Sequence, residues 1–371
     1  MTQYCRLSSS AITPPSAGSA ASFLRPPLRG AAEYDILHTV FRNGEVAQLV
    51  EHHVRNVGVE SSNLFFSTIL RPAMQNQTIN TKIIDGKQLA DNLRAEIAEG
   101  VCRIKNEKGL TPGLAVILVG DNPASVSYVT AKERACREAG MFSREIRLAA
   151  ETTESEVVRL INELNGDSAI HGILVQLPLP KHISEKSVIN AIAPEKDVDG
   201  FTPVNVGRMM IGEDCYLPCT PHGIIKLIEF SGMDIRGKHA VVIGRSNIVG
   251  KPVAALLSRR ETNATVTLCH TGTPDVARFT READIVVVAA GHPGTLTGDM
   301  LKKGAVVIDV GVNRIPDATR PKGFRLVGDA DFESCQGVAG AITPVPGGVG
   351  PMTITMLLWN TLESARRAAN A

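Results

Sequence analysis

Two side chains that can transfer protons, Tyr128 and Lys132, stand four residues apart in a segment with helical character. That spacing places both on one face of a helix. A lysine acts as a base near neutral pH only if its site lowers its pKa from the unperturbed value of about 10.4. A surface lysine beside a half-buried tyrosine would have the same spacing, so the pair alone does not establish a catalytic site.

A glycine-bounded strand–turn–helix pattern over residues 241–256 is typical of a dinucleotide site. Gly244 allows a tight turn after the strand and Gly250 lets the helix begin close to it, so that N–H groups at the helix N-terminus would face a pyrophosphate. The spacing is G-x-x-x-x-x-G rather than G-x-G-x-x-G, and an ordinary βα turn would also contain it. Arg245 and Ser246 suit the 2′-phosphate of NADP, so we expect NADP rather than NAD, unless Arg245 is a solvated surface cation.

Alternating strand and helix signals run through the chain from residue 82 and would position both features. This alternation predicts parallel βαβ units and an α/β fold. The turn-rich residues 197–220 are expected to form a linker and the wall of a cleft. Strands are expected at residues 82–85, 114–119, 144–148, 172–175, 239–243, 265–268, 284–289 and 305–309. Helices are expected at residues 87–106, 124–139, 153–164, 185–193, 221–230 and 351–369.

The composition narrows the class of protein. Lys and Arg number 39 and Asp and Glu 38, so the charge favours neither nucleic acid nor a membrane surface as a partner. No apolar run reaches the roughly 18 residues that a membrane span needs. The seven cysteines are scattered singly, which argues against a disulfide framework and for a reducing compartment. Cys215 and Cys219 are the closest pair, but no His/Cys cluster follows them, so we expect no metal site.

The first 73 residues differ in character from the rest. Residues 1–32 are rich in Ser, Ala and Pro and contain no Asp or Glu, as in an organellar transit peptide. Residues 44–68 have no clean helical or strand period and look like a conceptually translated transfer-RNA gene. We therefore expect that translation begins at Met74 rather than Met1 and that residues 1–73 are a non-native or disordered extension. A real, poorly ordered extension is the alternative.

Six segments occur in a specific order along residues 78–365: GDNPASVSYVTAK (120–132), GILVQLPLP (172–180), KDVDG (196–200), PCTP (218–221), GRSNIVG (244–250) and TPVPGGVGPMT (343–353). Together they are similar to the methylenetetrahydrofolate dehydrogenase/cyclohydrolase family. No position that matters in them departs from the family pattern. The resemblance implies a tetrahydrofolate substrate, NADP as cofactor and two consecutive reactions.

The resemblance also implies roles for individual residues. Lys132 resembles the general acid/base of the cyclohydrolase step, and Tyr128 would help to orient it. Gln176, at a strand end, would hold Lys132 and the substrate by hydrogen bonds. Asp199 would bind the pterin ring, because a carboxylate can accept paired N–H donors. Without the surrounding motif, Gln176 would be read as a solvent-facing polar residue and Asp199 as part of an Asp-Gly turn.

Other positions complete the expected site. Val175 and Leu177 flank Gln176 and are expected to contact the substrate. The loop Pro346, Gly347, Gly348, Val349 and Gly350 would let backbone approach the substrate, since glycine has no Cβ, although a plain loop before a helix would look the same. Val312 is expected to touch the nicotinamide side of NADP through its backbone, and residues 289–294 to line the same crevice.

These inferences give a two-domain α/β enzyme with its active-site cleft between the domains. Residues 74–220 would bind tetrahydrofolate, residues 221–343 would form a Rossmann-like NADP domain, and residues 344–371 would supply a substrate loop and a helix that packs back on the catalytic domain. The expected activity is oxidation of 5,10-methylenetetrahydrofolate followed by hydrolysis to 10-formyltetrahydrofolate, in a cytoplasmic homodimer. A dehydrogenase-only family member and a non-catalytic folate- or NADP-binding protein are the alternatives.

Overall fold

A computed structural model describes residues 79–320 and 323–370. The predictions for residues 1–73 and for Met74 lie outside this range. The first sheet has three strands in the order β3-β2-β4, and both strand pairs are parallel. Its strands are β2 (Gly113–Val119), β3 (Phe142–Leu148) and β4 (Gly172–Val175).

The helices around this sheet divide its central strand between two cores. Leu114, Val116 and Leu118 of β2 belong to the core that includes residues of α5 and α6, whereas Ala115 and Ile117 belong to the core formed with α7 and α8. This alternation follows from the two-residue period of a strand, and burial on both faces explains why β2 is apolar throughout. The helices are α5 (Gly86–Lys108), α6 (Pro123–Glu138), α7 (Glu154–Gly166) and α8 (Glu185–Ala191). The predicted capping box at Thr153 and Glu156 begins α7.

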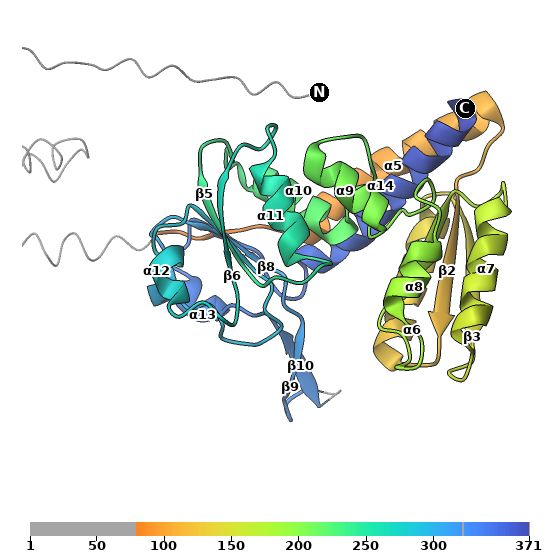
Figure 1. The fold of residues 1–371 in the computed structure, drawn as a ribbon. Coiled ribbons are helices and arrows are strands. Elements are labelled where there is room, and N and C mark those ends of the chain that lie inside the picture. Colours follow the sequence, from red (N-terminus) through yellow and green to blue (C-terminus); the bar gives the residue numbers. More distant parts are fainter. Residues whose placement is uncertain (1–78, 321–322, 371) are drawn as a thin grey trace, which may run out of the picture. The chain divides into compact units, whose positions relative to one another are not determined.

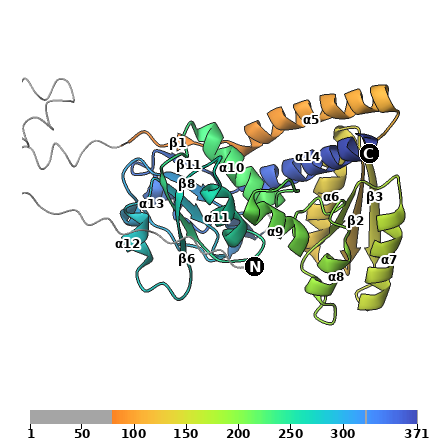
Figure 2. The same ribbon diagram turned by 45° about the horizontal axis from the view of Figure 1, so that its top comes forward.

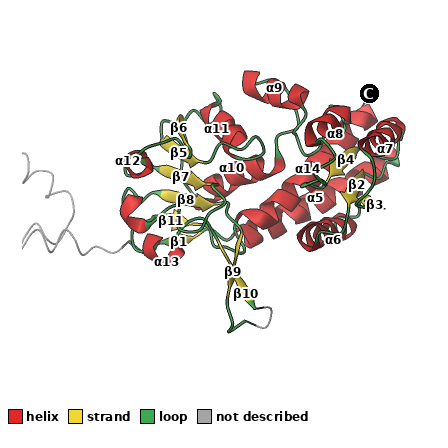
Figure 3. Ribbon diagram, turned by 60° about the horizontal axis from the view of Figure 1, so that its bottom comes forward, coloured by secondary structure: helices red, strands yellow, loops and turns green. Residues whose placement is uncertain are grey.

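The second sheet has six strands in the order β1-β11-β8-β7-β5-β6, and all neighbours are parallel. In Figure 3, α10 and α11 lie on one face of this sheet and α12 and α13 on the other. The sheet therefore has the covered, doubly wound architecture of α/β proteins. Its strands are β1 (Lys82–Ile83), β5 (His239–Ile243), β6 (Thr265–Cys269), β7 (Ile285–Val288), β8 (Val306–Asp309) and β11 (Ala341–Ile342). Its helices are α10 (Cys219–Ser231), α11 (Gly250–Ser258), α12 (Val276–Thr280) and α13 (Phe332–Cys335), with a 3₁₀ turn at Gly298–Met300.

Two long helices from opposite ends of the described chain lie side by side. Figures 1 and 2 show α14 (Val349–Asn370) along α5. Arg94 of α5 donates to Thr355 Oγ1 over 2.9 Å and to the carbonyl oxygen of Pro351 over 3.3 Å. α14 also packs against α10 and α6, so it links the helices of both sheets. The helix was predicted to begin at residue 351, and it begins two residues earlier.

The prediction of a turn-rich linker at residues 197–220 was wrong for its middle part. Residues Pro203–Ile211 form the helix α9, which begins after the N-cap Thr202 and ends at Gly212 in the left-handed conformation. Pro at the first turn and Gly after the last are common helix boundaries. Buried Met209 anchors α9, whereas Ile211 is exposed, so the apolar pattern was too short to indicate a helix from sequence.

Two strand pairings were not predicted from the sequence. The strand expected at residues 82–85 covers only residues 82–83, and it pairs with β11 at the edge of the six-stranded sheet. Residues Asn313–Pro316 (β9) and Phe324–Val327 (β10) form an antiparallel hairpin, whose four-residue strands are too short to be recognised from an alternating apolar pattern. Among the helices of residues 79–320 and 323–370, none is long and apolar enough to span a membrane.

Candidate active site and dinucleotide site

The helix α6 carries the lysine and tyrosine whose spacing suggested chemistry. Its N-cap is Asn122, whose side chain accepts hydrogen bonds from the N–H groups of Ala124 and Ser125. The two residues differ in burial although they share a helix face: Tyr128 is 46% exposed and Lys132 only 8%. Lys132 is thus not the solvated surface lysine that spacing alone allowed.

The buried ammonium of Lys132 is held by Gln176. Lys132 Nζ donates a hydrogen bond of 2.9 Å to Gln176 Oε1. Gln176 directly follows β4, its backbone N–H donates to the carbonyl oxygen of Ile117 in β2, and its Nε2 donates to that of Leu177 over 2.7 Å. The second bond turns the amide oxygen toward Lys132. Two predicted residues 44 positions apart are therefore brought into direct contact.

Asp199 is the nearby charge that acts on this lysine. Burial lowers the pKa of Lys132, and the negative charge of Asp199 opposes this effect. Burial in turn raises the pKa of Asp199, while Lys132 lowers it. Desolvation is the larger cause for both groups, so each neutral form is more accessible than it would be in water. A buried lysine with a lowered pKa is suited to accept and return a proton.

Asp197, which was not among the predicted site residues, shapes the loop that presents Asp199. Its carboxylate is 1% exposed. Oδ1 accepts from the N–H groups of residues 200 and 201, and Oδ2 from the N–H of Thr202 and from Asn205 Nδ2, over 2.8 to 3.1 Å. An Asp followed by an Asp-Gly turn was the available signal, but the donors that bind it become apparent only in the folded loop.

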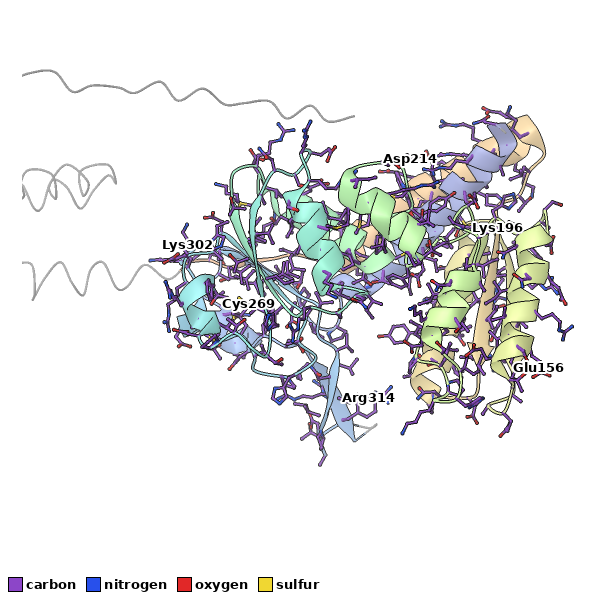
Figure 4. The ribbon with its side chains drawn as sticks, in the orientation of Figure 1. Glu156, Lys196, Asp214, Cys269, Lys302 and Arg314 are labelled. Carbon is purple, nitrogen blue, oxygen red and sulfur yellow. The ribbon has the colours of Figure 1, made fainter. Side chains whose placement is uncertain are left out.

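The C-terminal helix α14 also stabilises the loop that carries Asp199. Asn360 Nδ2 on α14 donates to the carbonyl oxygens of Val198 (2.8 Å) and Leu217 (2.9 Å). One turn later, Ser364 Oγ donates to the carbonyl oxygen of His171 over 2.6 Å. Lys196, labelled in Figure 4, fixes the start of the loop through two carbonyl oxygens on the α7 side. The Asp199 loop is therefore anchored by hydrogen bonds from several elements.

The glycine-rich segment before α14 lies against the start of α5. The carbonyl oxygen of Gly347 accepts from the N–H of Lys87 over 3.0 Å. Gly348 packs so closely on Gly86 that a Cβ on Gly86 would overlap the Gly348 carbonyl. This contact requires glycine at position 86, whereas Gly347 is favoured by its φ of +110° and Gly348 by the carbonyl oxygen of Pro344, which a Cβ would approach to 2.7 Å. Val349 and Gly350 belong to the first turn of α14.

The six-stranded sheet contains a topological switch point. From β5 the chain passes through α11 to β6 on one side and then returns through α12 to β7 on the other. In open α/β sheets, ligands bind outside the carboxyl ends of the strands at such a point. The loops after β5, β7 and β8 meet at this edge. They contain the predicted cofactor residues Gly244, Arg245 and Ser246, residues 289–294, and Val312.

The turn after β5 has the close packing expected of a dinucleotide turn. Gly244 has φ +121°, and a Cβ there would overlap the carbonyl oxygen of Ala289 after β7. Ser246 Oγ accepts from the N–H groups of Val249 (3.1 Å) and Gly250 (3.3 Å), so this hydroxyl shapes the start of α11. Arg245 is exposed, as a cation must be to reach a bound phosphate.

The end of β6 also bears on which dinucleotide the site fits. In NAD-binding sheets of this class a carboxylate about 20 residues after the turn binds the ribose 2′-hydroxyl. Here β6 ends at Cys269, labelled in Figure 4, and His270 and Thr271 follow. No carboxylate stands at this place to repel a 2′-phosphate. The exposed guanidinium, the tight turn and this strand end together fit NADP.

The fold and the two sites define a dinucleotide-dependent α/β enzyme with a buried lysine that is hydrogen-bonded to Gln176. Models of the tetrahydrofolate dehydrogenase/cyclohydrolase catalytic domain and of its NAD(P)-binding domain match residues 84–199 and 218–369. The bifunctional protein FolD of Moorella thermoacetica is 59% identical over 286 residues, which are 77% of this chain and 99% of that protein. The chain belongs to the tetrahydrofolate dehydrogenase/cyclohydrolase family.

Solved structures agree with this assignment. The bifunctional FolD methylenetetrahydrofolate dehydrogenase/cyclohydrolase of Campylobacter jejuni is 48% identical with a TM-score of 0.74, covering 77% of this chain and 99% of its own. The methylenetetrahydrofolate dehydrogenase-cyclohydrolase of Trypanosoma brucei, complexed with NADP cofactor and an inhibitor, is 42% identical with a TM-score of 0.75, covering 78% and 99%. The α/β fold class and the family resemblance predicted from sequence are thus confirmed.

Proposed function

We propose that this chain oxidises 5,10-methylenetetrahydrofolate to 5,10-methenyltetrahydrofolate with NADP⁺ and then hydrolyses the product to 10-formyltetrahydrofolate. The observation that carries the proposal is the buried hydrogen bond between Lys132 and Gln176 beside Asp199, in a chain that also has a dinucleotide turn at a switch point. The lysine site supplies proton transfer, and the turn supplies cofactor binding. An enzyme with dehydrogenase activity alone would need only the cofactor-binding turn.

In the first reaction the protein aligns donor and acceptor. Bound NADP⁺ supplies the hydride acceptor, which is the chemistry of the cofactor and not of the protein. Arg245 would hold the 2′-phosphate, and the turn from Gly244 to Ser246 would approach the pyrophosphate. Val312, through its backbone, would border the nicotinamide.

In the second reaction Lys132 moves protons. Neutral Nζ takes a proton from the water that attacks the methenyl carbon. It returns a proton to N5 as the bond between N5 and that carbon breaks, and one proton is released overall. Gln176 orients Nζ through Oε1, and the exposed ring of Tyr128 would lie along the substrate.

The remaining predicted residues would bind the substrate. Asp199 would accept N–H donors from the pterin ring. Val175 and Leu177 flank Gln176, and they would contact the ring system from the end of β4. Residues 346–350 would bring backbone close to the substrate from the start of α14.

The proposal includes the domain organisation expected from sequence. Residues 74–220 would bind tetrahydrofolate and residues 221–343 NADP, with 344–371 as substrate loop and C-terminal helix. We also propose a homodimer in the cytoplasm, supported by the family resemblance for the dimer and by the singly scattered cysteines for a reducing compartment. Light scattering of the purified chain would test the dimer, because a monomeric mass at micromolar concentration would contradict it.

The test uses the purified full-length chain and its Lys132→Met variant. Reduced cofactor is followed with 5,10-methylenetetrahydrofolate and either NADP⁺ or NAD⁺, and ring opening is followed separately from supplied methenyltetrahydrofolate. We expect both activities in the parent, faster oxidation with NADP⁺, and loss of ring opening in the variant. A variant with full ring opening would refute the role of Lys132. Oxidation without ring opening in the parent would leave a dehydrogenase only.

A further inference from the structure

Two buried carboxylates with no assigned role lie under the cofactor edge of the six-stranded sheet. Asp329 is fully buried. Its Oδ2 accepts from the N–H groups of Ala290 and Gly291, each over 2.7 Å, and its Oδ1 accepts from Asn313 Nδ2 over 2.8 Å. Ala290 and Gly291 belong to the loop after β7, and Asn313 is the first residue of β9, directly after the loop that follows β8. One side chain therefore connects two loops at the switch-point edge.

Asp309, the last residue of β8, holds Asp329 in place. Its Oδ1 accepts from the N–H groups of Gly311 and Asp329, and its Oδ2 accepts from that of Ala330, each over 2.9 Å. Its own N–H donates to Thr343 Oγ1 over 2.8 Å. The carboxylate that connects the loops is thus fixed by a second carboxylate anchored in the sheet.

The backbone at two glycines packs directly against the two carboxylates. A Cβ on Gly311 would overlap the carboxylate of Asp329, and a Cβ on Gly328 would overlap that of Asp309. Close packing of this kind restricts the loops to one arrangement. In that arrangement Val312, between Gly311 and Asn313, remains 51% exposed, as expected of a residue that a ligand covers.

Position in the sheet indicates which end of the cofactor these loops meet. In a doubly wound sheet the ribose of the adenosine lies at the end of the second strand of the nucleotide unit, which here is β6. The loops after β7 and β8 lie on the opposite side of β5, and they therefore face the nicotinamide end. Neither carboxylate is exposed to touch a ligand there.

We propose that Asp329 is a positioning residue that fixes the loops after β7 and β8 in the arrangement that receives the nicotinamide end of NADP. This inference rests on the proposed function. Without Asp329, the loop N–H groups would lose their acceptor, and the loops would have to be ordered by the cofactor at a cost in binding free energy.

The family's two reactions supply an internal control, because ring opening of supplied methenyltetrahydrofolate consumes no cofactor. The test compares Asp329→Asn with the matched control Asp331→Asn in the full-length chain. Asp331 is the exposed N-cap of α13, two residues further on, and asparagine caps equally well. The measurements are KM and kcat for NADP⁺, kcat/KM for ring opening, and the dissociation constant of NADPH by direct titration.

We expect Asp329→Asn to weaken NADPH binding and to raise KM for NADP⁺ about tenfold or more, the usual loss for a charge-assisted bond, while ring opening stays within about twofold of the parent. Asn313→Ala removes one of the three donors to Asp329, together with a 3.2 Å bond to the carbonyl oxygen of Gly328, and should raise KM about threefold. The control Asp331→Asn should change neither NADPH binding nor KM for NADP⁺. If Asp329→Asn does not fold, Asn313→Ala carries the test.

Unchanged NADPH affinity in a folded Asp329→Asn or Asn313→Ala protein would overturn the inference. An equal fall of ring opening and oxidation would also overturn it, since that indicates general destabilisation. Direct titration separates this failure from failure of the proposed function. A parent that binds NADPH but turns over no folate would refute the function and leave the binding comparison intact.

Discussion

Replacing Gln176 with methionine removes the amide oxygen that accepts the 2.9 Å hydrogen bond from Lys132 Nζ, at nearly constant side-chain volume. A hydrogen bond to a charged group contributes about 1.5–3 kcal/mol and a neutral one about 0.5–1.5 kcal/mol. The acceptor therefore favours the ammonium over the amine by about 1–1.5 kcal/mol. Because about 1.4 kcal/mol corresponds to one pH unit, the pKa of Lys132, already lowered by burial, should fall by about one more unit in Gln176→Met.

The assay is the pH dependence of kcat/KM for ring opening of supplied methenyltetrahydrofolate, with the rate without enzyme subtracted at each pH. If neutral Lys132 is the base, activity rises with pH, and Gln176→Met should move the midpoint of that rise about one pH unit lower. Gln176→Glu places a carboxylate beside the ammonium of Lys132 and should move the midpoint to higher pH. The control variant Gln336→Met changes an exposed residue after α13, beside the six-stranded sheet. It should leave the midpoint unchanged.

Opposite movements in the two Gln176 variants are the essential result. Two midpoints that move in the same direction, or that both coincide with the parent, would refute the argument that this hydrogen bond sets the pKa of the base. A lower kcat in either variant would not affect the conclusion, because the midpoint is independent of the maximal rate.

Two further predictions concern the nucleotide unit. Arg245→Gln should raise KM for NADP⁺ about 10- to 100-fold, the value of a charge-assisted phosphate contact, and leave KM for NAD⁺ nearly unchanged; equal effects on both cofactors, measured by steady-state kinetics, would contradict the role of Arg245. Burial raises the pKa of Asp309 to about 6, above the unfolded value of about 3.9. The native state thus holds the extra proton between these values, and the unfolding free energy should fall by on the order of 3 kcal/mol as pH rises through about 6. Asp309→Asn should lack this slope in denaturant titrations at pH 4.5–7.5, and parallel slopes in parent and variant would contradict the assignment.

Much of the fold followed from local patterns. Buried strands such as β2 and β5 are apolar runs bounded by turn residues, and the helix α7 begins with a capping box, so their existence was predictable to within two or three residues. The hairpin of β9 and β10 and the helix α9 were missed for a matching reason. The strands of the hairpin have only four residues each, and the apolar positions Val206, Met209 and Met210 of α9 span little more than one helical turn. Segments this short show too few repeats for an apolar period to be recognised in the sequence.

The candidate site divides in the same way. The sequence by itself determined that Tyr128 and Lys132 share a helix face, that a glycine turn follows β5, and that six ordered motifs match one family, because these depend on residue types at short range. Only the tertiary structure decided that Lys132 is buried and bonded to Gln176. It also decided that Asp197 and Asn360 hold the Asp199 loop.

Asp329 shows the limit most clearly. Its partners at residues 290 and 291 lie 39 and 38 positions away, and nothing in an isolated Gly-Asp pair distinguishes a turn residue from a buried anchor. Burial and hydrogen-bond partners at such separations arise when strands with no sequence relation become neighbours in a sheet. They are properties of the packed chain, and a sequence pattern that reports only local periodicity does not contain them.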